Sequence, residues 1–467
     1  MSLMSSVSKN VKTQQVSLLE WGRAAITLLH RQGMNFQRIA PDGRLVILVR
    51  ALRTFGYGFT SVLVGVVLTN AGVPTVQIGL LFAVAALGSI TFSLVMGMYA
   101  DRMGRKRSLV VSALLMMGTG CVFAFTRYYP LLLIAAFCGT ISPSTNDNTP
   151  FSGIEQSILA QSSSPERHTM LFAIYNLAAQ LAGAAGSLAI GLPEVLSHVG
   201  IDARLGVRCL FVLYGVLAGS TAVIFLGLSR AAELQPPQEQ TAPASVGEEA
   251  ATRKLTSAQQ TRLAPPKPRI RGVVFKLSSL FALDAFAGGL AVQTILAVWF
   301  RHRFGVSLGS LGLLFFGVNL LAALSFVAAP WLTKRFGLLK TMIVPHFISN
   351  VFLLLVPLMP MFPLAAVLLL LRQSLSKLDV PARQAYTIAL VSPEERTAAA
   401  SCTTVARSVA VSISPLLSGF LLSGPMLVLG LPILLASSIE MGYDATLWSM
   451  FRRVPLHPSH RGGRKSS

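Results

Sequence analysis

The sequence is poor in charged residues, and this shortage restricts what the protein can be. Only 12% of its 467 residues are charged, against about 25% in a soluble globular protein, while 53% are hydrophobic. Apolar runs of about 20 residues recur along the chain, long enough to cross the ~30 Å hydrocarbon core of a bilayer. A soluble enzyme, a disordered protein and a disulfide-stapled secreted module are therefore excluded. We expect a polytopic membrane protein.

Cysteine is also scarce, and catalytic motifs are missing. Cys121, Cys138, Cys209 and Cys402 lie singly in apolar runs without C-x-x-C spacing, so we interpret them as small core residues. The sequence lacks H-E-x-x-H, G-x-S-x-G and P-loop patterns, and no metal or cofactor is predicted. The net charge is +21, but the basic residues form no stripe with interleaved aromatics, so nucleic acid is not an expected partner.

The apolar windows predict an all-α protein with twelve transmembrane helices. They cover residues 47–70, 75–99, 108–126, 130–160, 168–193, 208–229, 273–299, 308–333, 338–359, 362–391, 397–422 and 425–448. The predicted organisation is a cytoplasmic segment 1–45, a six-helix half 46–229, a Pro-rich cytoplasmic linker 230–272, a six-helix half 273–450 and a basic cytoplasmic tail 451–467. Within the first segment, residues 15–33 are interpreted as an interfacial helix.

Lysine and arginine are distributed unevenly between the connections. With the amino terminus inside, the side opposite the termini receives Arg127, Arg204, Arg208, Arg301 and Arg303. Most of the other basic residues fall on the terminal side. The positive-inside rule therefore predicts that both termini are cytoplasmic, with the protein in the cell (inner) membrane.

The chain also contains an internal repeat. Residues 78–82 (IGLLF) reappear as residues 311–315 (LGLLF), and residues 164–169 (SPERHT) match residues 392–397 (SPEERT). These offsets of 233 and 228 indicate two pseudo-symmetric six-helix halves in parallel topology, with a polar site near the membrane midplane between them.

A loop between the second and third spans, residues 97–107, has the form G-x-x-x-D-R-x-G-R-K-R. It resembles the signature loop of the major facilitator superfamily, in a branch similar to drug/proton antiporters. The resemblance implies a latch that holds one face closed, formed by Gly97, Asp101, Arg102, Gly104 and Arg105. The second copy departs from the pattern, and Ala135 stands where such antiporters often carry an arginine.

The resemblance also implies that helices 1, 4, 7 and 10 line a central cavity, and the ionisable residues fall mainly on them. Each such group costs about 2.5–3.5 kcal/mol on insertion scales, so each is a functional candidate. They are Arg50 and Arg53 on helix 1, Asp147 and Glu155 on helix 4, Asp284 on helix 7, and Arg372, Lys377, Asp379 and Arg383 on helix 10. The polar Asn146 beside Asp147 is a further candidate.

Two carboxylates are the expected coupling groups. Asp147 lies in a polar run between two prolines, where irregular backbone typically lines a cavity. The alternative places that run at the outer interface, merely solvated. Asp284 is followed by two glycines and is expected to load and release a proton. The alternative is a structural ion pair with Arg50 or Arg53, although those arginines are expected to snorkel to the interface.

The repeat suggests one specific pair. Glu155 and Arg383 occupy equivalent positions at offset 228 and have opposite charge, so we predict an inner-gate salt bridge between them. The alternative gives each its own partner, Arg167 for Glu155 and Asp379 for Arg383. Glu440 and Asp444, four residues apart on helix 12, are interpreted as structural.

Together these features predict a secondary active transporter of a small solute, working by alternating access as a monomer in the lipid bilayer. Acidic residues on cavity helices favour export coupled to protons. One alternative is uptake of an organic anion bound by Arg372, Arg383 or Arg53. The other is a transporter-like sensor that moves nothing.

Overall fold

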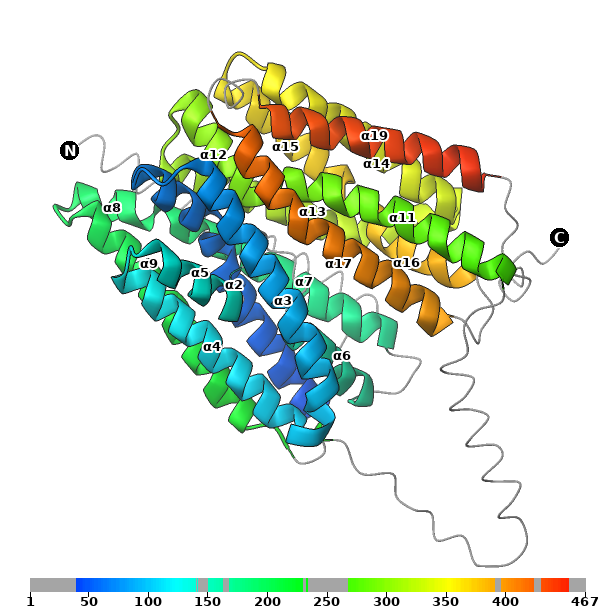
Figure 1. The fold of residues 1–467 in the computed structure, drawn as a ribbon, viewed down its shortest axis with the longest axis horizontal. Helices are drawn as coiled ribbons and strands as arrows, with labels where there is room; N and C mark the ends of the chain where they lie inside the picture. Colours follow the sequence, from blue (N-terminus) through cyan, green and yellow to red (C-terminus); the bar gives the residue numbers. More distant parts are fainter. Residues whose placement is uncertain are drawn as a thin grey trace, which may run out of the picture.

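The computed structural model describes residues 39–139, 141, 150–162, 168–229, 232–233, 268–390, 396–423 and 430–452, and these ranges form helices without a strand. Two bundles lie side by side (Figure 1). The first contains α2 (Pro41–Asn70), α3 (Thr75–Met103), α4 (Arg105–Phe125), α5 (Tyr129–Cys138), α6 (Pro150–Gln161), α7 (His168–Leu188), α8 (Leu192–His198) and α9 (Ala203–Leu226). The second contains α11 (Pro268–Leu290), α12 (Gln293–Phe304), α13 (Leu308–Phe336), α14 (Leu338–Leu355), α15 (Phe362–Leu375), α16 (Asp379–Leu390), α17 (Arg396–Leu421) and α19 (Leu431–Phe451).

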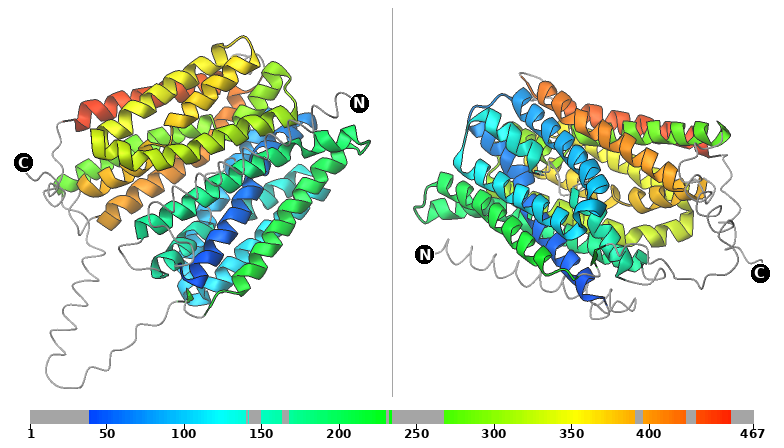
Figure 2. Two further views of the ribbon diagram at one scale, coloured as in Figure 1. Left: turned by 180° about the vertical axis from the view of Figure 1, so that it is seen from behind. Right: turned by 60° about the horizontal axis from the view of Figure 1, so that its bottom comes forward.

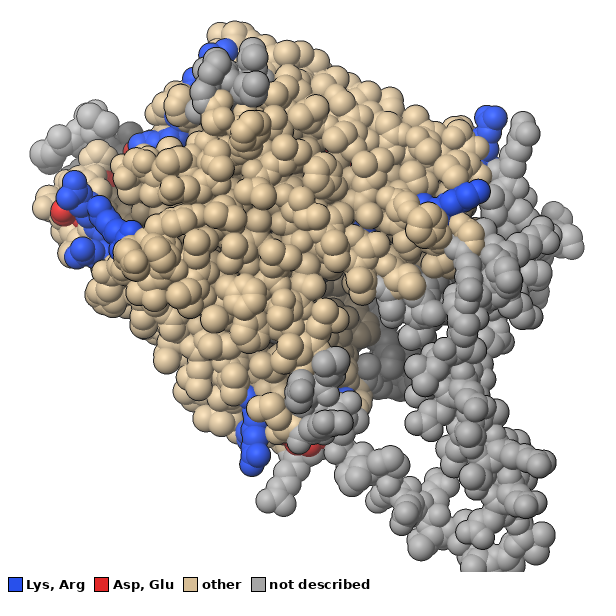
Figure 3. Space-filling model, in the orientation of Figure 1, with Lys and Arg blue, Asp and Glu red and all other residues tan. Residues whose placement is uncertain are grey.

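The outer surface of the bundles is apolar, as a lipid-facing surface must be. Nine helical segments of the described ranges are long and apolar enough to cross a membrane. The other three expected spans correspond to α5 with α6, α15 with α16, and α19, which are interrupted or carry polar residues. Figure 3 shows Lys and Arg at the ends of the helices, while the broad middle of the visible face carries almost none.

The same helix pairs are in contact in both bundles. α2 packs on α7 and α9 as α11 packs on α17 and α19; α4 packs on α9 as α14 packs on α19. α3 contacts α5 and α6, and α13 contacts α15 and α16. The contacts between bundles are also reciprocal, since α3 meets α17 and α7 meets α13. The predicted fold class, an all-α membrane protein of two pseudo-symmetric halves, is therefore confirmed.

The seventh expected span differs from its prediction because it is two helices. α11 ends at Leu290, and α12 begins at Gln293. The Ser418 hydroxyl donates to the Leu290 carbonyl at 3.0 Å and so satisfies one oxygen near the break. The interfacial helix predicted at 15–33, most of the linker and the basic tail lie outside the described residues.

The closest approaches between the halves lie at one end of the molecule, away from the start of α2 and the end of α19. Gly79 of α3 crosses Gly419 of α17, and Gly312 of α13 lies against the Ser187 carbonyl of α7. Gly65 of α2 lies against Thr294 of α12. Toward the other end the bundles diverge (Figure 2). Small residues allow this close packing. Side chains also join the halves here, since Asn319 Nδ2 of α13 donates to Ser187 Oγ of α7 at 3.1 Å.

We expect Gly419→Ala to disturb this contact. Its added methyl carbon would lie 2.8 Å from Gly79 Cα and 2.5 Å from the Thr75 carbonyl oxygen, which are backbone atoms with little freedom to yield. Overpacking of this kind costs about 1–3 kcal/mol, so the melting temperature in detergent should fall. Gly442→Ala on α19, which meets nothing within 4 Å, is the matched control. Equal melting temperatures for the two variants would contradict the close crossing.

Candidate functional site between the halves

A cavity of about 330 Å³ lies between the halves. The first half contributes α3, through residues such as Ala85 and Ser89, together with Ile141. The second half contributes most of the wall, from α11 to α17, with Glu440 of α19. The volume is at the small end of the range for ligand pockets, about 300–1,000 Å³. The expected helices 7 (α11 and α12) and 10 (α15 and α16) line this cavity, as the family resemblance implied, and Ile141 belongs to the expected helix 4. The other described residues that the first half contributes come from helix 2 (α3).

The charged side chains of the cavity come almost entirely from the second half. The cationic ones are Arg372, Lys377, Arg383 and Arg407, and the anionic ones are Asp284, Asp379 and Glu440. His346 also lines the wall. A bilayer makes isolated charges expensive, so the partner of each group decides what that group can do.

Asp284 is the most heavily paired carboxylate. Its Oδ2 accepts hydrogen bonds from Arg383 Nη1 at 2.7 Å and Arg407 Nη1 at 2.6 Å. Arg383 Nη1 also lies 3.1 Å from Asp379 Oδ2, one turn earlier on the same helix. Asp284 therefore joins α11 to α16 and α17 as a junction of charges. The structural alternative for Asp284 had named Arg50 or Arg53, and neither is its partner.

His346 connects α14 with α19. Its Nδ1 lies 3.0 Å from both carboxylate oxygens of Asp444 and 3.3 Å from Asn350 Nδ2. Its Nε2 faces Asp284 Oδ1 at 3.7 Å. A histidine held on one ring nitrogen by a carboxylate has a fixed orientation, so the other nitrogen is presented to the cavity side.

Glu440 is the least satisfied carboxylate of the site. Its nearest cationic atom is Arg372 Nη2 at 3.8 Å from Oε2, beyond hydrogen-bond distance, and Oε2 has no hydrogen-bond partner among the described residues. Helix α19 is peripheral, but Gly288 of α11 lets the side chain pass: a Cβ there would lie 3.2 Å from Glu440 Oε1.

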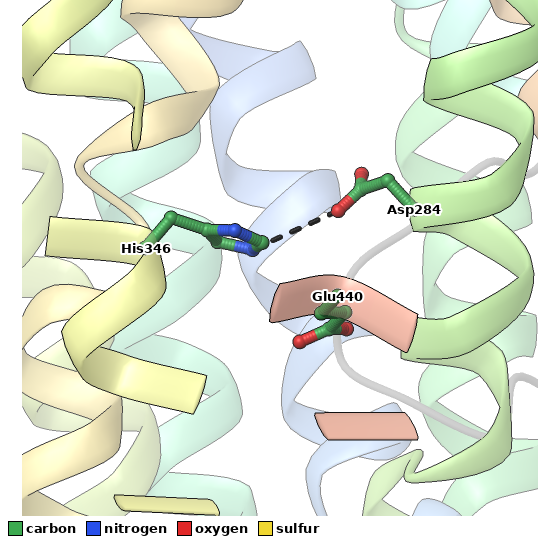
Figure 4. A group of neighbouring side chains, drawn as sticks. All are labelled: Asp284, His346 and Glu440. Carbon is green, nitrogen blue, oxygen red and sulfur yellow. Dashed lines mark ion pairs between the residues drawn. The ribbon is translucent and has the colours of Figure 1, made fainter. Parts of the chain in front are cut away.

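Asp284, His346 and Glu440 converge from three helices (Figure 4), and one ligand atom from each lies within 4.8 Å of the others. This spacing could in principle suit a metal ion. The two guanidinium groups already bonded to Asp284 place positive charge beside that position, which opposes a cation. We therefore interpret the group as part of the charge network.

Lys377 has no salt-bridge partner within the part of the chain that the structure describes, yet it lines the cavity. It lies in the turn between α15 and α16, five residues after Arg372. Arg372 and Lys377 thus bring positive charge to the cavity that no short salt bridge among the described residues neutralises.

The first half contains a second buried charge network. Arg53 of α2 and Glu155 of α6 are both 0% exposed and form a bidentate pair, with Arg53 Nη2 donating to Glu155 Oε2 at 3.1 Å. The Tyr175 hydroxyl of α7 donates to the same oxygen at 2.6 Å. Arg53 therefore does not snorkel to the interface, because its partner lies inside the half. Arg50 lies over the Tyr175 ring at 5.0 Å.

The predicted pair between Glu155 and Arg383 is corrected by these contacts. Each residue pairs with an opposite charge within its own half: Glu155 with Arg53, and Arg383 with Asp284 and Asp379. Glu155 and Arg383 are equivalent in the repeat, and the helices of their partners are equivalent too: Arg53 lies on α2, the first span, and Asp284 lies on α11, in the seventh. The contact of Arg383 with Asp379 is the one that the alternative interpretation of the sequence had named.

The remaining predicted residues are only partly visible. Asn146 and Asp147 lie outside the described residues, and the side chains of Gly97, Asp101 and Arg102 are not among those described. Gly104 separates α3 from α4 with φ +90°, as Gly337 separates α13 from α14 with φ +83°.

Arg105 of the signature loop contacts the first half and the start of the linker. Its Nη1 donates to Gln161 Oε1 of α6 at 2.8 Å. Glu233 accepts the backbone N–H groups of Arg105 and Lys106 at 2.7 and 3.1 Å, and so caps α4.

Sequence reasoning missed His346, Glu440, Arg407 and Tyr175 as members of these networks. Glu440 was interpreted as structural, on a helix outside the four that the family resemblance places at the cavity. The available signal was Gly288-Gly289 on helix 7, which opens a path for a long side chain from a neighbouring helix.

A double-mutant cycle tests the pairing of Glu155. Removing one member of a buried ion pair costs about 3–5 kcal/mol, because the other charge stays buried without compensation. We expect Glu155→Met to lower stability by that amount and Arg53→Met in the same chain to recover most of it, measured by unfolding in detergent. The control cycle combines Glu155→Met with Arg383→Met, whose effects should add within about 0.5 kcal/mol. Strong coupling in the control cycle would restore the pair predicted from the repeat.

Known proteins resemble this chain in sequence and in fold. The sequence profile of the Major Facilitator Superfamily matches residues 46–372. An uncharacterized membrane protein of Saccharomyces cerevisiae, YJR124C, is 27% identical over 435 residues, which are 90% of this chain and 96% of that protein. The inward-open xylose transporter XylE from E. coli has a TM-score of 0.64 at 13% identity, with 89% of this chain and 97% of that chain covered.

A bacterial homolog of the human lysosomal transporter Spinster, solved inward-facing and unoccupied, has a TM-score of 0.63 at 16% identity, with 87% and 97% of the two chains covered. At these identities the two solved structures support the fold alone, whereas the family match spans most of the sequence. The chain therefore belongs to the Major Facilitator Superfamily, and it is a membrane transporter of a small solute rather than an enzyme.

Proposed function

We propose that the protein is a proton-coupled secondary transporter and that Glu440 carries the coupling proton. The observation that supports this most is the state of Glu440: it is buried, it lines the cavity, and its Oε2 has no hydrogen-bond partner among the described residues. A carboxylate of this kind can exchange a proton without first breaking a strong bond. We assign this role to Glu440 in place of Asp284, which is committed to two guanidinium groups.

The arrangement of the halves supports alternating access. Their closest contacts are glycines and small polar residues at the end away from the termini, and the bundles diverge at the opposite end. Rocking would separate α3 from α17 and α7 from α13 while closing the terminal side. With both termini in the cytoplasm of the cell, as the basic residues favour, the cavity would open inward, and a single chain would contain the whole pathway.

The direction of coupling depends on the charge of the solute. A cation that binds Glu440 competes with the proton, and such competition produces exchange; this is the export by proton antiport favoured by the sequence. An anion that binds near Glu440 instead favours its protonation, and such cooperation produces co-transport. One experiment can therefore distinguish exchange of solute and proton from their co-transport.

We expect Glu440→Gln to abolish proton movement while leaving the protein folded. Wild-type protein in liposomes loaded with a pH-sensitive dye should change the internal pH when succinate, xylose or tetraethylammonium is added as the probe. Glutamine has the same shape but cannot take up a proton, so the signal should fall to that of liposomes without protein. Asp202→Asn is the matched control, because asparagine caps α9 as well as aspartate does.

Two outcomes contradict this proposal. If Glu440→Gln moves protons as fast as the wild type, the coupling group lies elsewhere. If the wild type binds a probe but moves neither the probe nor protons, the protein acts as a sensor.

A further inference from the structure

We infer that the transported solute is a small organic anion and that Lys377 and Arg372 bind its carboxylate or phosphate group. This inference rests on the proposed passage of solute through the cavity between the halves. It is independent of whether Glu440 is the proton carrier.

The charges of the cavity wall leave positive charge in excess. Arg383 and Arg407 are both bonded to Asp284, and Arg383 also contacts Asp379. Arg372 Nη2 lies 3.8 Å from Glu440 Oε2, and Lys377 forms no salt bridge among the described residues with its anionic neighbours Asp379 and Glu440. An anionic group would supply the missing counter-charge.

Hydrogen-bond donors are likewise in excess around the same cavity. Arg372 Nε and Gln293 Nε2 are buried without a hydrogen-bond partner among the described residues, and so is the Ser376 hydroxyl. Arg372 Nη1 reaches only Gln373 Oε1, at 3.4 Å. Buried donors normally have partners, so a set of unused donors on one cavity wall indicates a ligand rich in acceptor oxygens. Carboxylate and phosphate groups are such ligands.

The rest of the wall suits a small organic body. Leu296, Phe315, Val318 and Leu369 line the same cavity as the charged residues. Apolar side chains beside cationic ones accommodate a short carbon skeleton with an acidic group at one end. A volume of about 330 Å³ limits the solute to a small molecule.

Anion binding would change the surroundings of Glu440. The groups that face Glu440 are Arg372 from α15, Lys377 from the turn after it, His346 from α14, Asp284 from α11, and Asp444 one turn further along α19. An anion on Arg372 takes away the one guanidinium near Glu440 and adds a negative charge beside it. Glu440 then takes a proton from solution, so anion and proton cross the membrane together. For this solute class the coupling is co-transport in place of the exchange favoured by the sequence.

Binding to the full-length protein in lipid nanodiscs tests the assignment, with succinate as the carboxylate probe and glycerol 3-phosphate as the phosphate probe. Isothermal titration calorimetry should detect one or both, and neither succinamide nor glycerol, which lack the charge. Lys377→Gln should weaken binding about tenfold or more, since a charge-assisted hydrogen bond is lost. Arg372→Gln should do the same, and Lys377→Arg should retain binding within a few fold.

Lys340→Gln is the matched control, because Lys340 is exposed on α14 and does not line the cavity. Its affinity for the anion should equal that of the wild type. The inference is overturned if the wild type binds neither anion better than its neutral analogue, if it prefers tetraethylammonium, or if Lys377→Gln and Arg372→Gln both bind as well as Lys340→Gln does.

The two proposals fail in different ways. Accumulation of succinate that depends on Lys377 but not on the pH gradient would leave the anion site standing and remove proton coupling. Proton-driven exchange of tetraethylammonium that is lost in Glu440→Gln would leave proton coupling standing and remove the anion site.

Discussion

A charge buried within a bilayer is tolerable only beside a partner, and this constraint organises the protein. The structure meets it inside each half: Arg53 holds Glu155 in the first, and Arg383 with Arg407 holds Asp284 in the second. None of these pairs joins the two halves. The contacts that do join them are close approaches of small residues, such as Gly79 on Gly419, together with apolar packing and hydrogen bonds such as that from Asn319 Nδ2 to Ser187 Oγ. The halves can therefore separate without leaving any of these buried charges uncompensated.

Duplication preserved positions in this chain, but not the sign of the charge. Glu155 and Arg383 occupy equivalent places on helices 4 and 10, and the partners on helices 1 and 7 have reversed sign accordingly. Both halves thus contain an ion pair between equivalent helices, but the acidic and basic members have exchanged places. Asymmetry enters through residues outside it: the second half adds Lys377 and Arg372 at the cavity and brings Glu440 in from a peripheral helix. A cavity with one charged wall and one nearly uncharged wall can orient a polar solute.

How far the sequence could reach differs from residue to residue. Composition and the repeat were sufficient for the fold class, because hydropathy and self-similarity are properties of the chain itself. Asp284 could be singled out as a charge on an apolar helix, but its partners could not, since Arg383 and Arg407 lie about a hundred residues away and reach it only after helix packing. Glu440 was interpreted as structural from the sequence, and its place at the cavity depends on the packing of Gly288 against its side chain.

The sequence by itself determined that the protein lies in a membrane, consists of helices and is built from two related halves. Those properties follow from the amounts and spacing of apolar residues, which act locally and do not depend on neighbours. The tertiary structure decided which charges neutralise one another and which remain available to a ligand. Pairing depends on distances of 2.6 to 3.8 Å between side chains far apart in the chain, and these distances exist only once the helices have packed.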